Sequence, residues 1–174
     1  MKLRQLLLLS ALFACASAAK ESSGCTDQHP DGLEPAIMQE GLADRSRALC
    51  FSSYSVLHSG LTRSPLYASE RLTRQSAEAA NAFEYRDNRF HAEDDLPADE
   101  RAELADYVRS GFDRGHMAPS GDMATQEDDF ASFSLANIVP QAGGLNRSGW
   151  ASLEGYVRSL AITFDEAYIV TGPA

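Results

Sequence analysis

The chain has few of the features that mark specialised protein classes. Its 174 residues include three cysteines, one tryptophan, four histidines and only two lysines. Three cysteines are too few for a disulfide-dense scaffold. The sequence also has no internal repeat and no low-complexity segment, which excludes a repeat protein and a largely disordered one. Hydrophobic residues make up 44% of the chain, enough for the core of one domain.

The one long apolar run lies at the N-terminus. Two basic residues precede an apolar stretch from Leu6 to Ala16, and small residues follow at the positions where a signal peptidase cleaves. The run is too short to span a bilayer. We therefore expect residues 1–19 to be a signal peptide and the protein to be secreted or periplasmic. Lipidation at Cys15 is a weaker alternative, because Phe13 fits a lipoprotein signal poorly.

Cys25 and Cys50 are the cysteines that remain after that segment. An exported chain with an even number of cysteines favours a disulfide between them, which would contribute about 3 kcal/mol of stability. A metal site built from Cys25 and His29 is an alternative that lacks further ligands nearby. Residues 20–49 are polar and contain Gly and Pro, so we expect an N-terminal lead-in, loosely packed and held by the bridge.

Acidic residues outnumber basic ones by 25 to 15, which gives a net charge of −10. Taken alone, this balance argues against a polyanionic partner, since phosphate binding relies on Lys and Arg. The acidic residues concentrate in residues 91–106 and 126–130, however, and arginines are distributed around the motifs described below. Arginine suits bidentate phosphate contact, although most of these side chains are explained as solvated surface arginines.

Hydrophobic patterning predicts both strands and helices along the chain. Alternating residues in 50–60 and an extended run at 66–73, separated by turn residues, indicate a hairpin. Helical spacing predicts helices over 97–111 and 144–160, and we expect strands over 130–141 and 167–172, the last of them buried. Mixed antiparallel strands with segregated helices define an α+β domain.

Three stretches then occur in a specific order: "SGFDRGHMAPSGDM" (110–123), "SLANIVPQ" (134–141) and "LNRSGWASLEGYVR" (145–158). Together they resemble the DNA/RNA non-specific endonucleases of the ββα-metal, or His-Me finger, type. The resemblance runs from about Cys50 to the end and implies an endonuclease domain over residues 50–174 with a mainly antiparallel sheet. Members of this family continue beyond the final "YIVTGPA", so we expect the C-terminal strands of the sheet to be missing.

The resemblance implies a metal-dependent nuclease and assigns roles at the motif. His116 becomes the general base that activates water, a task to which a neutral imidazole is suited near pH 7. Arg114 becomes the side chain that stabilises the transition state, and Gly115 between them permits a local departure from extended backbone. Asn146 becomes the ligand, through its amide oxygen, of one Mg²⁺ or another divalent cation such as Mn²⁺.

The same resemblance assigns Glu154 to orienting metal-bound water, and Arg158 with Arg86 to the substrate phosphates. Two ordinary structural alternatives stay open: an i, i+4 ion pair between Glu154 and Arg158, and a helix N-cap at Asn146. The spacing does not decide between Arg86 and Arg89 as the upstream arginine. Supporting positions are expected at Asn137, Gln141 and Asp113.

Contacts to phosphates carry no base information, so DNA and RNA are both expected substrates. Two other functions remain as alternatives. One is a phosphodiesterase for small nucleotides that uses the same base and metal. The other is a non-catalytic exported nucleic-acid-binding or adhesion protein, against which the intact His116, Asn146 and Glu154 argue.

Overall fold

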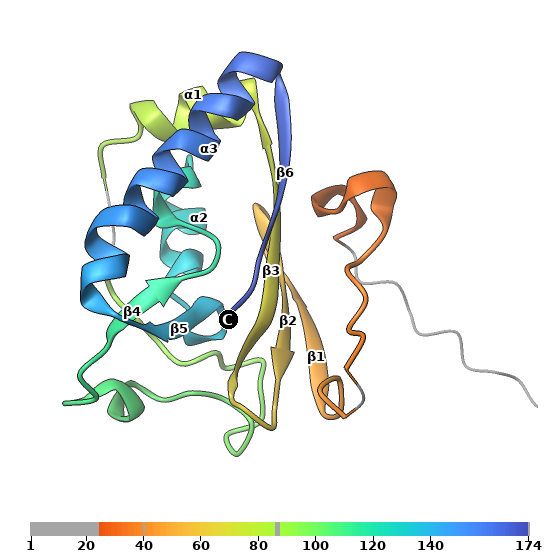
Figure 1. The fold of residues 1–174 in the computed structure, drawn as a ribbon, viewed down its shortest axis with the longest axis vertical. Helices are drawn as coiled ribbons and strands as arrows, with labels where there is room; N and C mark the ends of the chain where they lie inside the picture. The colour runs from red at the N-terminus through yellow and green to blue at the C-terminus, as the bar shows by residue number, and fades with distance from the viewer. Residues whose placement is uncertain (1–24, 40, 86–87, 174) are drawn as a thin grey trace, which may run out of the picture.

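A four-stranded antiparallel sheet forms the centre of the molecule (Figure 1). The computed structural model describes residues 25–39, 41–85 and 88–173. Neighbouring strands of the sheet follow the order β1-β2-β3-β6, with bounds β1 Ser46–Cys50, β2 Tyr54–Ser59, β3 Ser64–Thr73 and β6 Glu166–Thr171. A separate antiparallel pair consists of β4 Asp113–His116 and β5 Ile138–Gln141.

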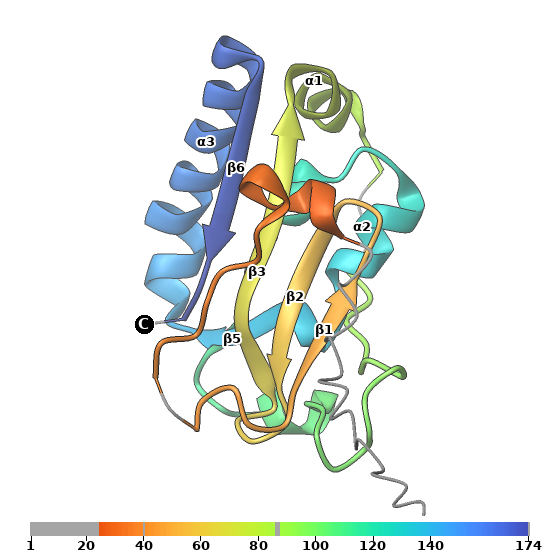
Figure 2. The ribbon, with the colours of Figure 1, turned by 90° about the vertical axis from the view of Figure 1, so that its right-hand side faces the viewer.

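The helices and the small sheet cover one face of the central sheet, and residues 25–39 lie across the other (Figures 1 and 2). The α-helices are α1 Arg74–Ala82, α2 Gln126–Ser132 and α3 Ala151–Phe164, the last continuing directly from a π-helix, Leu145–Trp150. Short 3-10 turns occur at Thr26–Gln28, Pro30–Gly32, Leu104–Tyr107, Ser120–Asp122 and Leu135–Asn137. This mixed architecture is the α+β class that the sequence predicts.

The main core joins the two sheets. Tyr54 and Val56 of β2 pack with Met117 and Met123, which follow β4, and with Val139 of β5. Met117 is directly after His116, and it is 3% exposed. The segment that carries the motif is therefore held by buried apolar contacts on both sides of the small sheet.

The predicted hairpin is confirmed as β2 and β3. The strand β1 and the helix α1 were not predicted. The helix α1 begins at a capping box in which the Thr73 hydroxyl accepts a hydrogen bond from the Ser76 amide at 3.1 Å, and the Ser76 hydroxyl accepts one from the Thr73 amide. A Thr-Arg-Gln-Ser sequence can start a helix, but no apolar periodicity draws attention to the residues that follow.

The predicted helix over 97–111 is wrong. Only Leu104–Tyr107 form a 3-10 turn, and the residues before it are turns. The carboxylate of Glu100 is drawn instead to the guanidinium groups of Arg45 at 2.9 Å and Arg47 at 2.6 Å. The apolar spacing also lacks a buried partner, since Leu104 is 44% exposed. Ion pairs therefore hold this segment as a loop, because no packing of an apolar helical face stabilises a helix here.

Two strand predictions are correct only in part. In the run 130–141, extended backbone is limited to β5. The start of the run belongs to α2, which Thr125 caps by accepting a hydrogen bond from the Asp128 amide at 3.1 Å. The C-terminal strand forms as β6 but is not buried: within the described residues it pairs with β3 alone, and Val170 is 49% exposed. The predicted helix over 144–160 is confirmed, with a π-helical first turn.

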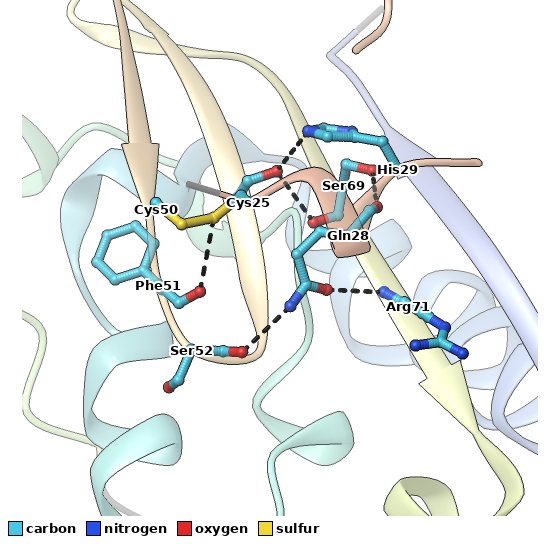
Figure 3. Close-up of a disulfide and its surroundings, with 9 residues drawn as sticks. Cys25, Gln28, His29, Cys50, Phe51, Ser52, Ser69 and Arg71 are labelled. Atoms are coloured by element: carbon cyan, nitrogen blue, oxygen red, sulfur yellow. Dashed lines mark hydrogen bonds between the residues drawn. A yellow bond between two sulfur atoms is a disulfide. The ribbon is translucent and has the colours of Figure 1, made fainter. Parts of the chain in front are cut away.

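The predicted disulfide between Cys25 and Cys50 is present (Figure 3). The first described residues of the lead-in, 25–29, pack against the sheet, whereas residues 30–39 are mostly exposed. Gln28 donates to the Ser52 carbonyl at 3.1 Å and accepts from the Arg71 amide at 3.1 Å. These buried contacts fix the start of the described chain to the sheet, which polar composition alone does not reveal.

Residues 1–19 and Cys15, on which the export and lipidation predictions depend, lie outside the described residues. Over the part of the chain that the structure describes, none of the helices has the length and apolar character needed to cross a membrane.

Candidate functional site

The motif strand β4 pairs with β5 so that Gly115 is opposite Val139 and His116 is opposite Ile138. A side chain at position 115 has no room, because a Cβ there would lie 2.3 Å from Oε1 of Gln141. The buried Gln141 side chain therefore lies directly over Gly115. Glycine is required here for a close approach rather than for a special backbone angle.

Arg114 and His116 lie on the same face of β4. The guanidinium carbon of Arg114 is 4.0 Å from the centroid of the Phe90 ring, and the His116 ring centroid is 5.6 Å from the same ring. The departure from extended backbone that we expected at Gly115 does not occur and is not needed, because residues two apart in a strand share a face. Phe90 thus forms a common wall for both side chains.

The His116 imidazole is enclosed by aromatic rings. Phe133 meets it edge-on with centroids 4.8 Å apart, and Phe90 covers another side. Burial lowers the pKa of His116 to about 4, and the nearby carboxylate of Asp129 opposes this shift only in part. The Nε2 atom is buried without a hydrogen-bond partner. The ring is therefore neutral at pH 7, the form that can accept a proton.

Asp113 connects the motif strand to the π-helix. Its carboxylate accepts hydrogen bonds from Arg147 Nε at 2.7 Å, from Arg147 Nη2 at 2.6 Å and from Asn146 Nδ2 at 3.1 Å. These donors, Arg147 first, hold the pKa of Asp113 below its usual value. Through this hydrogen bond Asp113 orients the amide of Asn146, and its supporting role stays a prediction.

Asn146 is not the helix N-cap that we kept as an alternative. The cap position is Gly144, and Asn146 lies inside the π-helix, where its own amide donates to the Ala142 carbonyl at 2.9 Å. Single π-helical turns occur often at functional positions. Because Nδ2 donates to Asp113, Oδ1 is left to face another ligand. The side chain is therefore free to offer an oxygen.

A cavity of about 470 Å³ lies beside these residues. Its polar lining residues are Asp113, Arg114, Asn146 and Arg147. Its apolar and aromatic lining residues are Phe90, Leu104, Tyr107, Val108 and Phe112. His116 is not among the lining residues; it lies behind Phe90.

The remaining predicted residues lie apart from this cavity. Glu154 lines a smaller cavity of about 50 Å³, together with Glu70 and Asp122. Arg158 pairs with the buried carboxylate of Asp122. The alternative ion pair between Glu154 and Arg158 is not found; both side chains lie near Glu70, and Arg158 pairs with Asp122. The structure therefore does not bring Glu154 and Arg158 to the cavity that Asn146 lines.

Glu70 is the residue in this second group that sequence reasoning missed. It is 3% exposed on β3, and its Oε2 atom has no hydrogen-bond partner. Burial raises the pKa of Glu70 to about 8, with the Glu154 carboxylate adding to the shift, and burial raises the pKa of Glu154 to about 7. A glutamate at an inward position of an otherwise apolar strand was the available signal.

Asn137 supports the motif indirectly. It is fully buried; Oδ1 accepts from the Ala118 amide at 2.9 Å, and Nδ2 donates to the carbonyls of Ala118 and Ser132 at 2.8 and 2.9 Å. It fixes the loop after His116 rather than the imidazole itself. Gln141 packs over Gly115, and its Oε1 atom has no partner.

Of the two upstream arginines, Arg86 lies outside the described residues. Arg89 lies with its guanidinium carbon 5.0 Å from the centroid of the Phe130 ring. The choice between them stays undecided.

The donor set fits a hard cation held mainly by water. Within the described residues, no cluster of three or more His, Cys, Asp or Glu side chains could hold a metal ion. Mg²⁺ prefers oxygen ligands and keeps several waters, so one amide oxygen at the edge of an open polar cavity suits it. Asn146 is the lining residue whose side-chain amide could offer such an oxygen.

Comparison with known proteins identifies the family and the fold. A chain from the crystal structure of an EndoG/EndoGI complex superimposes with a TM-score of 0.67 at 34% identity, covering 72% of this chain and 52% of that one. Among curated sequences, Nuclease C1 of Cunninghamella echinulata is 42% identical over 70% of this chain and 49% of its own length. Mitochondrial endonuclease G of Bos taurus is 34% identical over 95% of this chain and 56% of its own.

The fold is thus that of a ββα-metal nuclease. The sequence model of the DNA/RNA non-specific endonucleases matches residues 34–174, and the chain belongs to that family. It spans about half the length of the curated relatives that it matches.

Proposed function

We propose that this chain carries the catalytic residues of a metal-dependent endonuclease that hydrolyses phosphodiester bonds in DNA and RNA without sequence preference. The observation that carries the proposal is the neutral His116 imidazole on the same face of β4 as Arg114, next to a cavity that Asn146 lines. Membership of the nuclease family supports it.

His116 is the proposed general base. A neutral imidazole can take a proton from the attacking water. Phe90 and Phe133 flank the ring, so this role requires water to reach the imidazole between its aromatic neighbours. Exposure of the ring would also raise its pKa from about 4 towards the ordinary value of 6.5, which improves the base.

Arg114 is the proposed stabiliser of charge on the phosphoryl group. It has an aromatic neighbour, Phe90, and no acidic partner within the described chain. Its charge is therefore not neutralised before substrate binds. Arg147, by contrast, is paired with Asp113 and contributes mainly to placing Asn146.

Asn146 is the proposed protein ligand of one Mg²⁺ or a similar divalent cation. When bound, the cation would act as a Lewis acid and offset negative charge on the phosphoryl and departing oxygens. Asp113 fixes which atom of the Asn146 amide faces the cation. A neutral ligand leaves the charge of the cation available to the polyanion.

Glu154, Arg158 and Arg86 complete the proposal with roles taken from the family. Glu154 is assigned to orienting water near the cation, which requires its side chain to approach the cavity that Asn146 lines, and the two arginines are assigned to the substrate phosphates. Contact to substrate requires Arg158 to leave Asp122 or to act while still paired with it.

We also propose that the protein is exported. The N-terminal pattern of residues 1–19 supports this, as does the disulfide, a bond that persists in oxidising compartments. Recovery of the protein, shortened by its first 19 residues, from periplasm or medium would support export. Accumulation of the full-length chain inside the cell would contradict it.

The test of the activity is incubation of the purified protein with plasmid DNA, with RNA and with a dinucleotide, each with Mg²⁺ and with a chelator. We expect Mg²⁺-dependent fragmentation of both polymers. Hydrolysis of the dinucleotide alone would indicate a small-nucleotide phosphodiesterase. Binding without cleavage, insensitive to chelator, would indicate a non-catalytic binding protein.

A further inference from the structure

The cavity beside Asn146 has two chemically different kinds of lining. Guanidinium and amide groups form one part of it, and Leu104, Val108 and Phe112 form an apolar wall of the same cavity. These three side chains are 44%, 68% and 54% exposed, which is unusual for neighbouring large apolar residues. Nothing in the described core explains why this wall faces outward.

Phe112 is held in place by a tight turn. Arg109 and Gly111 both adopt left-handed backbone, with φ of +57° and +82°. Within the turn, the Ser110 hydroxyl accepts a hydrogen bond from the Phe112 amide at 3.2 Å. The next residue begins β4. The turn therefore fixes the backbone position of Phe112, two residues before Arg114.

Charge complementarity defines the ligand that fits both the polar lining residues and the apolar wall of this cavity. Arg114 has no acidic partner in the described chain, and Arg147 shares the one carboxylate of the cavity, Asp113. Two guanidinium groups and one carboxylate give the polar lining a net positive charge. A ligand that complements this charge and the apolar wall has an anionic group joined to a flat aromatic one, which is the composition of a nucleotide.

Given the proposed function, we infer that Phe112, with Leu104 and Val108, binds a nucleobase adjacent to the scissile phosphate. The base stacks on the Phe112 ring while its phosphate meets Arg114. Such stacking tolerates every base, because each has a π-face. The subsite therefore adds affinity without adding sequence preference. A base paired in a duplex has both faces covered by its neighbours, so the subsite takes an unpaired base.

The test measures binding and cleavage separately. Fluorescence anisotropy with chelator present gives the affinity for a short single-stranded oligonucleotide and for the same backbone with abasic sites throughout. We expect Phe112→Ala to weaken binding of the ordinary oligonucleotide about 5- to 150-fold and to leave abasic binding unchanged. Phe112→Trp should retain the wild-type affinity.

Phe164→Ala is the matched control, since Phe164 is also exposed but lies at the far end of α3, away from this cavity (Figure 1). It should change neither affinity. Equal loss on ordinary and abasic strands, or no loss in Phe112→Ala, would overturn the subsite. Cleavage with Mg²⁺ is scored independently: if the wild type prefers ordinary to abasic strands but cuts neither, the proposed activity fails and the subsite stands.

Discussion

Asn146 of the π-helix donates its side-chain amide to Asp113 of β4 at 3.1 Å. This bond joins two segments that are 33 residues apart in the sequence. Arg147 binds the same carboxylate through two nitrogens, so three donors converge on one acidic group. The orientation of the Asn146 amide therefore depends on the strand that also carries Arg114 and His116.

Asn146→Ala should lower activity mainly by weakening the binding of the cation. The variant loses the one proposed protein oxygen but keeps His116 and Arg114. Raising the Mg²⁺ concentration should therefore restore part of the rate. Measuring rate against Mg²⁺ concentration checks this, and a curve that keeps its midpoint while losing height would contradict the assignment of Asn146.

His116→Ala should lower the rate about 10²- to 10⁴-fold, the usual contribution of a general base. No Mg²⁺ concentration should rescue it, because the loss concerns proton transfer. Thermal unfolding of the variant shows whether the fold persists, since the ring also packs between Phe90 and Phe133. A folded variant with near-wild-type activity at neutral pH would remove His116 from the mechanism.

Much of the fold and the family could be predicted from the sequence, because both depend on local signals. Alternation marked β2 and β3, and two cysteines marked the disulfide. The ordered stretches around His116 and Asn146 marked the family. The errors occur where tertiary contacts decide: Glu100 binds Arg45 and Arg47, so the expected helix becomes a loop.

The distribution of the site residues could not be predicted for a similar reason. Helical spacing placed Asn146, Glu154 and Arg158 in one row, but it does not say what each side chain meets. The structure separates Glu154 from Asn146, and it pairs Arg158 with Asp122. The strand pattern could have drawn attention to Glu70, but its proximity to Glu154 and Arg158 is apparent only in the structure.

Phe90→Ala should raise the pKa of His116 from about 4 towards 6.5. Burial is the main cause of the lowered pKa, and Phe90 is one of the two rings that enclose the imidazole. NMR titration of the imidazole signals measures it. Phe130→Ala is the control, because Phe130 stacks on His91 with centroids 4.3 Å apart; His116 should then keep its pKa. An unshifted His116 in Phe90→Ala would mean that Phe90 does not shield it.

Glu70→Gln should flatten the dependence of stability on pH. The folded pKa of Glu70 is about 8 and its ordinary value is 4.5. Because the unfolded chain releases this proton first, the contribution of Glu70 is fully present below pH 4.5 and is lost as pH rises through about 8. Glu154, with its pKa near 7, acts in the same direction.

Urea unfolding across this pH range measures the effect. The free energy of unfolding of the wild type should fall as pH rises, by about 1.4 kcal/mol for every tenfold difference in proton affinity between the folded and the unfolded carboxyl. Glu70→Gln should fall less steeply, and the gap between the two curves should close at low pH. Glu78→Gln, at an exposed position of α1, is the control for removing a carboxylate. Parallel curves for the wild type and Glu70→Gln would contradict the buried, protonated state of Glu70.

Reduction of the Cys25–Cys50 bridge should lower stability without first affecting activity. The bridge closes a loop with a sequence separation of 25, and a loop of that size contributes about 3 kcal/mol in the chain-entropy model. It anchors Gln28 and the lead-in to the face of the central sheet that lies opposite β4, β5 and α3 (Figures 1 and 3).

The bridge therefore constrains the chain far from Asn146 and His116. The reduced protein, and the Cys25→Ser/Cys50→Ser variant, should unfold at lower temperature and keep the wild-type rate at temperatures where they are still folded. Thiol titration of the denatured, unreduced protein should show that Cys25 and Cys50 are not free thiols. Two reactive thiols from these positions would exclude the bridge. The proposal of export would then lose the support that the disulfide gives it.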